Sequence, residues 1–297
     1  MGSGSFTKEV YAFYNASMSS VDGRSYDNIT GRVKGQTYIS RHLHESLDPT
    51  KFSIRECVNT DEHPNTIPVI LALDVTGSMG GACSETAAAL GLIMTELYNK
   101  FKDIEFCIMG IGDLAYDNAP VQMSQFESDV RIAEALDKLY MERGGGGNAF
   151  ESYTVAWYMG LHRTKLDCYD KQGRKGIIIT MGDETLNPYL PVYELNKATN
   201  SNAQADVETE DLYEEASKKF DIFHITIDDP KCSSSYYIDR IRNTFGKILG
   251  DHLKTSSINN LSNTIVDCIS ESIEGGVKVN SSSPYINNVN ENGEISW

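Results

Sequence analysis

One carboxylate and two hydroxyls follow a short apolar run at alternate positions. The run covers residues 67–73, and Asp74, Thr76 and Ser78 come directly after it. In an extended or gently turning loop, alternate side chains share a side, so these oxygens can converge on one point. Such donors suit Mg²⁺, Mn²⁺ or Ca²⁺ better than zinc or copper. The spacing predicts a divalent-cation site; the alternative is that Asp74 and Ser78 only cap the following helix.

A second carboxylate stands at the end of another apolar segment. Residues 176–181 read GIIITM, and Asp183 follows closely. Upstream, four glycines at 144–147 favour neither helix nor strand and predict a sharply bent loop. Glu151 comes shortly after them, where we expect a helix to begin. Because the carboxyl ends of parallel strands line the ligand crevice of an open α/β sheet, these loops are expected at one edge.

Together, these loops resemble the metal-ion-dependent adhesion site (MIDAS) of von Willebrand factor A (vWA) domains. The first loop of that site reads Asp-x-Ser-x-Ser, and this chain keeps the middle hydroxyl as Thr76. The resemblance implies that Asp74, Thr76 and Ser78 bind Mg²⁺, or Mn²⁺ or Ca²⁺ in its place. It also implies that Asp183 is the third-loop ligand.

The second loop departs from the commonest vWA pattern, which has a Thr after paired glycines. It is similar to a branch, including integrin β subunits, in which a Glu after a Gly- or Asp-containing turn is the ligand. Glu151 is therefore the second-loop candidate, and Asn148 is a weaker one. Asp113 and Asp117 resemble a feature of intracellular members, which points to an intracellular, bacterial or phage-like branch. We expect Asp113 to support the site or cap a turn rather than to bind the cation itself.

Nucleotide-binding and phosphatase motifs do not fit the same residues. A phosphate-binding P-loop needs Lys and then Ser or Thr after its glycines, whereas Asn148 and Ala149 stand here. A dinucleotide site needs its glycines directly after the first strand. Phosphatases of the haloacid-dehalogenase type carry a second Asp where this chain has Thr76. The sequence thus offers no general acid of that kind.

Composition describes a globular, acidic chain. Of the 297 residues, 40% are hydrophobic and 23% charged, and the formal charge of −16 disfavours nucleic-acid binding. No apolar stretch has the roughly 18 residues of a membrane span, and the start of the chain has no apolar signal-peptide core. The six cysteines form no Cys-x-x-Cys pair, and we expect Cys107 and Cys268 to be buried thiols. These features predict a cytoplasmic protein without a membrane segment.

The elements that must position the candidate ligands alternate along the chain. Apolar runs predict strands at 67–73, 104–112, 176–181 and 221–227, and helical spacing predicts helices at 84–102, 129–140, 150–164, 208–219, 234–245 and 258–274. Repeated β-α units predict a doubly wound, mostly parallel sheet with helices on both faces.

The same alternation sets the expected domain boundaries. Residues 67–274 are expected to form the vWA-like, Rossmann-like domain. Residues 1–66 show no long helical pattern, and we expect an extension packed on or near the domain, either as edge strands or as an arm. Residues 275–297 are polar and are expected to form a flexible tail.

For function, the resemblance implies binding rather than turnover. The protein would be a metal-dependent protein-binding module, with an Asp or Glu of a partner completing the metal shell. One alternative is a metal-dependent phosphoesterase-like hydrolase in which Glu151 or Asp183 acts as a base. Another is a structural subunit whose site is vestigial, with Asp74 and Ser78 kept as helix caps.

Overall fold

The core of the molecule is a six-stranded sheet with strand order β14-β13-β9-β4-β5-β6. The computed structural model describes residues 5–35, 40, 42–142, 150–228 and 235–275. All neighbouring strands are parallel except β6, which pairs antiparallel with β5. The strands are β4 (Ile67–Asp74), β5 (Ile104–Ile111), β6 (Val121–Met123), β9 (Gly176–Gly182), β13 (Phe220–Ile227) and β14 (Leu253–Ser256).

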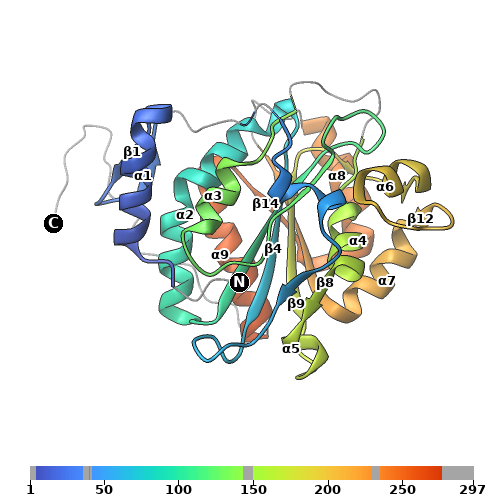
Figure 1. The fold of residues 1–297 in the computed structure, drawn as a ribbon. Coiled ribbons are helices and arrows are strands. Elements are labelled where there is room, and N and C mark those ends of the chain that lie inside the picture. Colours follow the sequence, from blue (N-terminus) through green and yellow to red (C-terminus); the bar gives the residue numbers. More distant parts are fainter. Residues whose placement is uncertain (1–4, 36–39, 41, 143–149, 229–234, 276–297) are drawn as a thin grey trace.

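Helices cover both faces of this sheet (Figure 1). Val69, Leu71 and Leu73 of β4 point into a core on one face, which includes buried residues of α2 (Gly80–Lys100), α3 (Arg131–Asp137) and α9 (Leu261–Glu274). Ile70 and Ala72 point into the core on the other face. That second core includes residues of α4 (Thr154–Arg163), α6 (Val192–Thr199), α7 (Thr209–Lys219) and α8 (Ser235–Leu249). A central strand buried on both faces explains the unbroken apolar run in its sequence.

The predicted fold class is therefore confirmed. The structure differs from the prediction in where some helices begin and in the strands at the edges of the sheet. Helix α2 begins at Gly80, four residues before its predicted start, and α4 begins at Thr154. The edge strands β6 and β14 were not predicted, because strands of three and four residues carry too little periodicity to be recognised. Cys107 and Cys268 are fully buried free thiols, as expected.

Residues before the central sheet also form regular structure. Helix α1 (Lys8–Asp22) has fifteen residues in a segment where no long helix was predicted, and a hairpin of β1 (Ser25–Asp27) and β2 (Arg32–Lys34) follows it. Helix α1 approaches α2 closely at Gly91. A Cβ there would lie 2.8 Å from the ring of Tyr11 and from the Gly31 carbonyl oxygen, so only glycine fits.

Short pairings complete the fold. Strand β3 (Arg55–Cys57) pairs in parallel with β8 (Thr164–Leu166), and α5 (Asp167–Asp170) follows β8. Strand β7 (Phe150–Glu151) pairs in parallel with β10 (Thr185–Leu186), and β11 (Tyr189–Leu190) pairs with β12 (Val207–Glu208). No helix in the described ranges is long and apolar enough to cross a membrane. The domain boundaries at 66 and 274 stay a prediction.

A buried ion pair joins the N-terminal segment to the main body. Arg24 donates two hydrogen bonds of 2.9 Å to Asp137 at the end of α3, and their side chains are 3% and 8% exposed. Arg24 also pairs with Asp22, and the Tyr14 hydroxyl donates to Asp137. Both carboxylate oxygens of Asp137 therefore accept hydrogen bonds from residues that precede the central sheet.

Asp137→Ala should lower the free energy of unfolding by about 3–5 kcal/mol, because it leaves the Arg24 charge buried without this partner. Urea unfolding followed by circular dichroism measures the change. Glu134→Ala on the same helix is the matched control. Its carboxylate pairs with Lys138 at 3.5 Å on the surface, and its loss should cost only about 0.3–0.5 kcal/mol. Equal losses for the two variants would contradict the anchoring role of the Arg24–Asp137 pair.

Candidate functional site

Two carboxylates meet where adjacent parallel strands end. Asp74 is the last residue of β4, and Asp183 directly follows β9. The two strands pair up to Leu73 and Met181, so their carboxyl ends lie side by side. The Ser78 hydroxyl bridges the two loops by donating to Asp183 Oδ1 at 3.2 Å. The structure thus brings the first-loop and third-loop candidates together.

The first loop folds around the Asp74 carboxylate. The Thr76 amide donates to Asp74 Oδ1 at 2.9 Å, and the Thr76 hydroxyl donates to the same oxygen at 2.5 Å. A short 3₁₀ turn over Gly77–Met79 then leads into α2, whose N-cap residue is Met79. Neither the turn nor α2 has a side-chain capping hydrogen bond at its N-cap. Neither Asp74 nor Ser78 is therefore the N-cap residue of the turn or of α2.

The hydroxyl hydrogens of this loop have partners within the site. Thr76 directs its hydrogen to Asp74, and Ser78 directs its hydrogen to Asp183. A hydroxyl that donates in this way keeps its oxygen lone pairs available to accept from a donor or to bind a cation. The Asp and Thr or Ser oxygens thus form a donor set that hard cations prefer.

Tyr153 belongs to the same cluster, although it was not predicted from the sequence. Its hydroxyl donates to Asp74 Oδ2 at 2.8 Å and accepts from the Glu184 amide at 3.3 Å. A Cβ at position 182 would lie 1.9 Å from this hydroxyl, so Gly182 is required for the approach. A glycine placed directly before Asp183 was the one available sequence signal.

Glu151 lies in β7 rather than at the start of a helix. It is paired with Leu186, it is 5% exposed, and its Oε2 atom has no hydrogen-bond partner. Burial, followed by the charges of Asp74, Asp117 and other nearby carboxylates, raises the pKa of Glu151 far above its ordinary value. The weaker candidate Asn148 lies outside the described residues.

Further carboxylates come from the loop after β5. Asp113 is buried, and its Oδ2 atom has no partner. Asp117 Oδ2 accepts from the Asp113 amide at 2.7 Å, and burial, together with neighbouring carboxylates, raises the pKa of Asp117 to about 6. Glu142 accepts hydrogen bonds from the amides of residues 118 and 119. This loop touches the second loop through the Leu114 amide, which donates to the Ser152 hydroxyl.

The cluster around Asp74 and Asp183 contains several carboxylates, and few basic side chains balance their negative charge. Burial raises the pKa of Asp183 to about 6, with a further contribution from Glu184, and burial likewise raises the pKa of Asp74. No Lys, Arg or His in the described part of the chain forms an ion pair with Asp74, Asp183 or Glu151. A bound divalent cation would offset this repulsion and the loss of hydration.

The donor chemistry limits which cation fits. Within the described ranges, no group of three or more His, Cys, Asp and Glu side chains is placed to hold a metal ion. The converging set is instead the carboxylates of Asp74 and Asp183 with the hydroxyls of Thr76 and Ser78. Such a set fits Mg²⁺, Mn²⁺ or Ca²⁺ rather than zinc. The Oε2 atom of Glu151 has no hydrogen-bond partner, and its role as a metal ligand stays a prediction.

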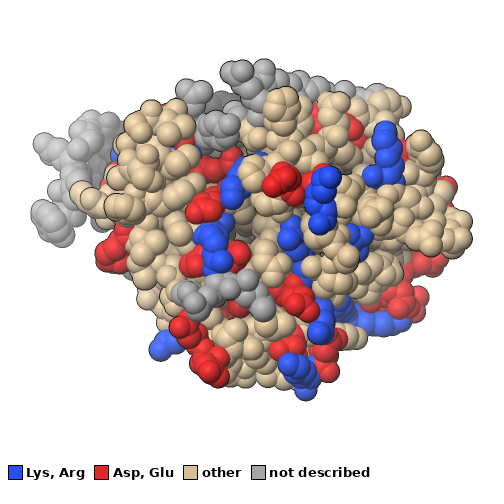
Figure 2. Space-filling model, in the orientation of Figure 1, with Lys and Arg blue, Asp and Glu red and all other residues tan. Residues whose placement is uncertain are grey.

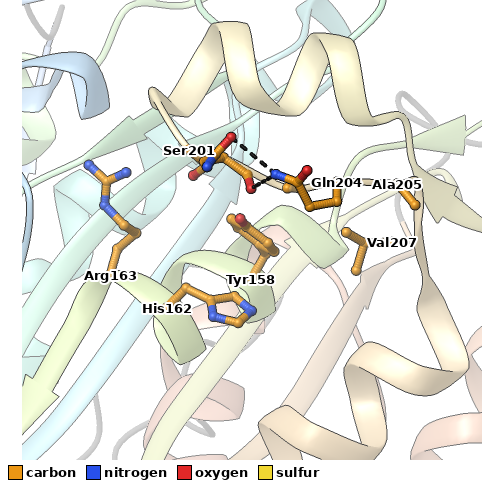
Figure 3. A pocket seen from close by; sticks show the side chains of 9 residues that line it. Tyr158, His162, Arg163, Ser201, Gln204, Ala205 and Val207 are labelled. Atoms are coloured by element: carbon orange, nitrogen blue, oxygen red, sulfur yellow. Dashed lines mark hydrogen bonds between the residues drawn. The ribbon is translucent and has the colours of Figure 1, made fainter.

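A hollow of about 550 Å³ lies elsewhere, between the end of α4 and residues 201–207. Figure 3 shows Tyr158, His162 and Arg163 on one side of it and Ser201 and Gln204 on the other. None of the predicted site residues lines it. Burial and the nearby Lys219 lower the pKa of His162 below its ordinary value. The hollow has no paired nucleophile and base among the residues that line it.

Charges of both signs are spread over the surface. On the face shown in Figure 2, Lys and Arg side chains stand among Asp and Glu side chains rather than in one continuous basic patch.

No protein-family model matches this chain, and no curated protein sequence matches it. Among solved structures, the pilus adhesin SpaC from Lactobacillus rhamnosus GG in an open conformation is similar with 11% identity and a TM-score of 0.49. The match covers 82% of this chain and 32% of SpaC. A second SpaC structure is similar with 12% identity and a TM-score of 0.47. The vWF domain of the type V pili tip protein Mfa5 from Porphyromonas gingivalis is similar over 74% of this chain and 99% of that domain, with 12% identity and a TM-score of 0.43. This chain thus spans about a third of SpaC, and the fold class rests on the sheet topology described above.

Replacing Asp183 with Asn should stabilise the protein at neutral pH in the presence of a chelator. The folded pKa of Asp183 is about 6, above its unfolded value of roughly 3.9. Its contribution to stability is therefore fully present below about pH 4 and is lost as the pH rises through about 6. Asp183→Asn does not titrate, so its unfolding free energy relative to wild type should rise across this window. Urea unfolding at several pH values measures the unfolding free energy of Asp183→Asn minus that of wild type. If this difference falls as the pH rises, burial and repulsion do not destabilise the ionised Asp183.

Proposed function

We propose that this chain is a vWA-like, divalent-metal-dependent protein-binding module with a metal-ion-dependent adhesion site. The observation that carries the proposal is that Asp74 and Asp183 are both buried at adjacent strand ends, that Ser78 of the first loop donates to Asp183, and that no described basic side chain forms an ion pair with either carboxylate. The sheet order and the position of the pair at the carboxyl ends of β4 and β9 support it. The similarity to SpaC and to the vWF domain of Mfa5 adds no weight to it.

In this proposal Asp74, Thr76, Ser78 and Asp183 would hold Mg²⁺, or Mn²⁺ or Ca²⁺ in its place. The bound cation would supply positive charge and an open coordination position for an Asp or Glu of a protein partner. Thr76 and Ser78 donate their hydroxyl hydrogens to the carboxylates, so their oxygen lone pairs can face the cation. Glu151, whose pKa is raised by burial and nearby carboxylates, would bind the cation directly or through water after losing its proton. A cytoplasmic location is also part of the proposal, and the five described cysteines are free thiols.

Substitutions in the first loop test the metal site. Asp74→Ala and Asp183→Ala should abolish tight Mn²⁺ binding in calorimetric titrations, because each removes a carboxylate from a small oxygen shell. Thr76→Ser should bind like wild type, since the hydroxyl remains, whereas Thr76→Val has nearly the same shape without the oxygen and should bind about 10–100-fold more weakly. Normal binding by Thr76→Val would show that the first loop is assigned wrongly.

The proposed partner carboxylate has its own test. Protein captured from cell extract by the immobilised chain in Mg²⁺ should be released by chelator, and it should not be captured by Asp74→Ala. A peptide library with Asp or Glu at a fixed position, compared with the same library carrying Asn or Gln, should bind only in the acidic form. Equal binding of both libraries would argue against a partner carboxylate on the metal.

A metal-dependent phosphoesterase is the second candidate, and Glu151 favours it. A buried carboxyl with a raised pKa and an unpartnered oxygen is a group that can hold and release a proton. Under the binding proposal, generic phosphoesters with Mg²⁺ should give no turnover, and Glu151→Gln should weaken Mn²⁺ binding only moderately. Sustained turnover that is lost in both Asp74→Ala and Glu151→Gln would replace the binding proposal with hydrolysis.

A further inference from the structure

Tyr153 connects the first and third loops of the site through a single hydroxyl. The hydroxyl donates to Asp74 Oδ2 at 2.8 Å and accepts from the backbone amide of Glu184 at 3.3 Å. Glu184 directly follows Asp183, so the contact fixes the third loop relative to the first. Tyr153 itself precedes α4 as its N-cap residue and is 0% exposed. One phenol therefore contacts all three segments that surround the proposed cation position.

Packing holds the ring of Tyr153 in one place. Its ring meets His224 edge to face, with centroids 5.1 Å apart, and Phe245 of α8 at 5.6 Å. His224 and Phe245 stack on each other at 3.6 Å, and His224 Nδ1 lies 2.9 Å from the Thr180 hydroxyl. Gly182 provides the space for the phenol, since any Cβ there would overlap the hydroxyl. A ring enclosed in this way cannot turn its hydroxyl away from Asp74 without disturbing the core.

As a result, both carboxylate oxygens of Asp74 accept hydrogen bonds, and the donors come from different segments of the chain. Oδ1 accepts from the amide and hydroxyl of Thr76, and Oδ2 accepts from Tyr153. Rotation of the carboxylate would break hydrogen bonds on both sides, so its orientation is fixed before any ligand arrives. Groups that orient a metal-binding carboxylate are usually important for metal affinity.

We propose that Tyr153 is a positioning residue that sets the cation affinity of this site by holding the Asp74 carboxylate against the third loop. The role rests on the proposed metal-binding function and adds to it a residue outside the resemblance to vWA domains. Tyr153 acts through Asp74 and does not itself bind the cation. A purely structural tyrosine would need only some partner for its hydroxyl, whereas this one bridges the two loops that carry the proposed ligands.

The test compares Tyr153→Phe with Tyr158→Phe in the full chain. Both tyrosines belong to the α4 region, and the Tyr158 ring contacts His162 away from the site. Calorimetric titration with Mn²⁺ should show binding about 10–100-fold weaker for Tyr153→Phe, and unchanged binding for Tyr158→Phe. The melting temperature in chelator should differ little between the two variants, and the additional stabilisation by Mn²⁺ should be smaller for Tyr153→Phe.

Other outcomes separate this role from the function on which it rests. No Mn²⁺ binding by wild type would overturn the proposed metal site and the role of Tyr153 with it. Equal Mn²⁺ affinity of wild type and Tyr153→Phe would overturn the role of Tyr153 alone, as would a lower melting temperature in chelator without weaker binding. Phe245→Leu is a second variant, which loosens the ring and keeps the hydroxyl. It should also weaken Mn²⁺ binding, and full affinity there would overturn the argument from packing.

Discussion

Two buried carboxylates approach each other where β4 and β9 end, and much of the surrounding structure follows from that approach. Asp74 and Asp183 lose hydration and repel each other, and several nearby donors are directed at them. The Thr76 amide and hydroxyl, the Ser78 hydroxyl and the Tyr153 hydroxyl all donate to this pair. These donors are neutral, so they do not compensate the negative charge of the cluster, and no described basic side chain forms an ion pair with Asp74 or Asp183.

The sheet geometry explains why this need arises at one edge. Each strand that leads to the site is buried on both faces, so its backbone direction is fixed by packing on two cores. Polar side chains at the strand ends therefore cannot move apart to reduce their repulsion. A rigid scaffold that forces like charges together stores free energy, and a ligand of opposite charge can recover it on binding. Binding and hydrolysis would both use this feature, which is why the fold class alone does not separate them.

The sequence predicted the parts of the molecule that depend on local periodicity. Strand β4 and its neighbours carry unbroken apolar runs, and their predicted ends agree with the structure to within about one residue. The placement of Asp74 and Asp183 at one edge of the sheet followed from the parallel strand direction together with the resemblance to vWA domains. Tyr153 was missed because its contact with Asp74 spans 79 residues and depends on how α4 packs over the sheet.

Other differences have similar causes. Glu151 lies in a two-residue strand because Leu186 is available to pair with it, and this partner is distant in sequence. Helix α1 was missed because its pattern is weak: Val10 and Phe13 remain exposed, while Tyr11 and Asn15 are its only fully buried residues. Caps at Thr7 and Gly23 help this helix, and packing on α2 and the nearby Arg24–Asp137 pair hold it against the main body.

That ion pair also has a consequence for the order in which the protein is made. Arg24 and Asp137 are separated by 113 residues, and a ribosome that adds about 5–20 residues per second needs roughly 6–23 s to cover that distance. During this interval the first segment has left the ribosome while the surface that receives it is incomplete. Strand β3 likewise cannot pair until β8 has been synthesised. The N-terminal segment can contact α2 earlier, but the Arg24–Asp137 pair that fixes it can form only after α3 has emerged, so helix α1 is held incompletely for several seconds of every synthesis.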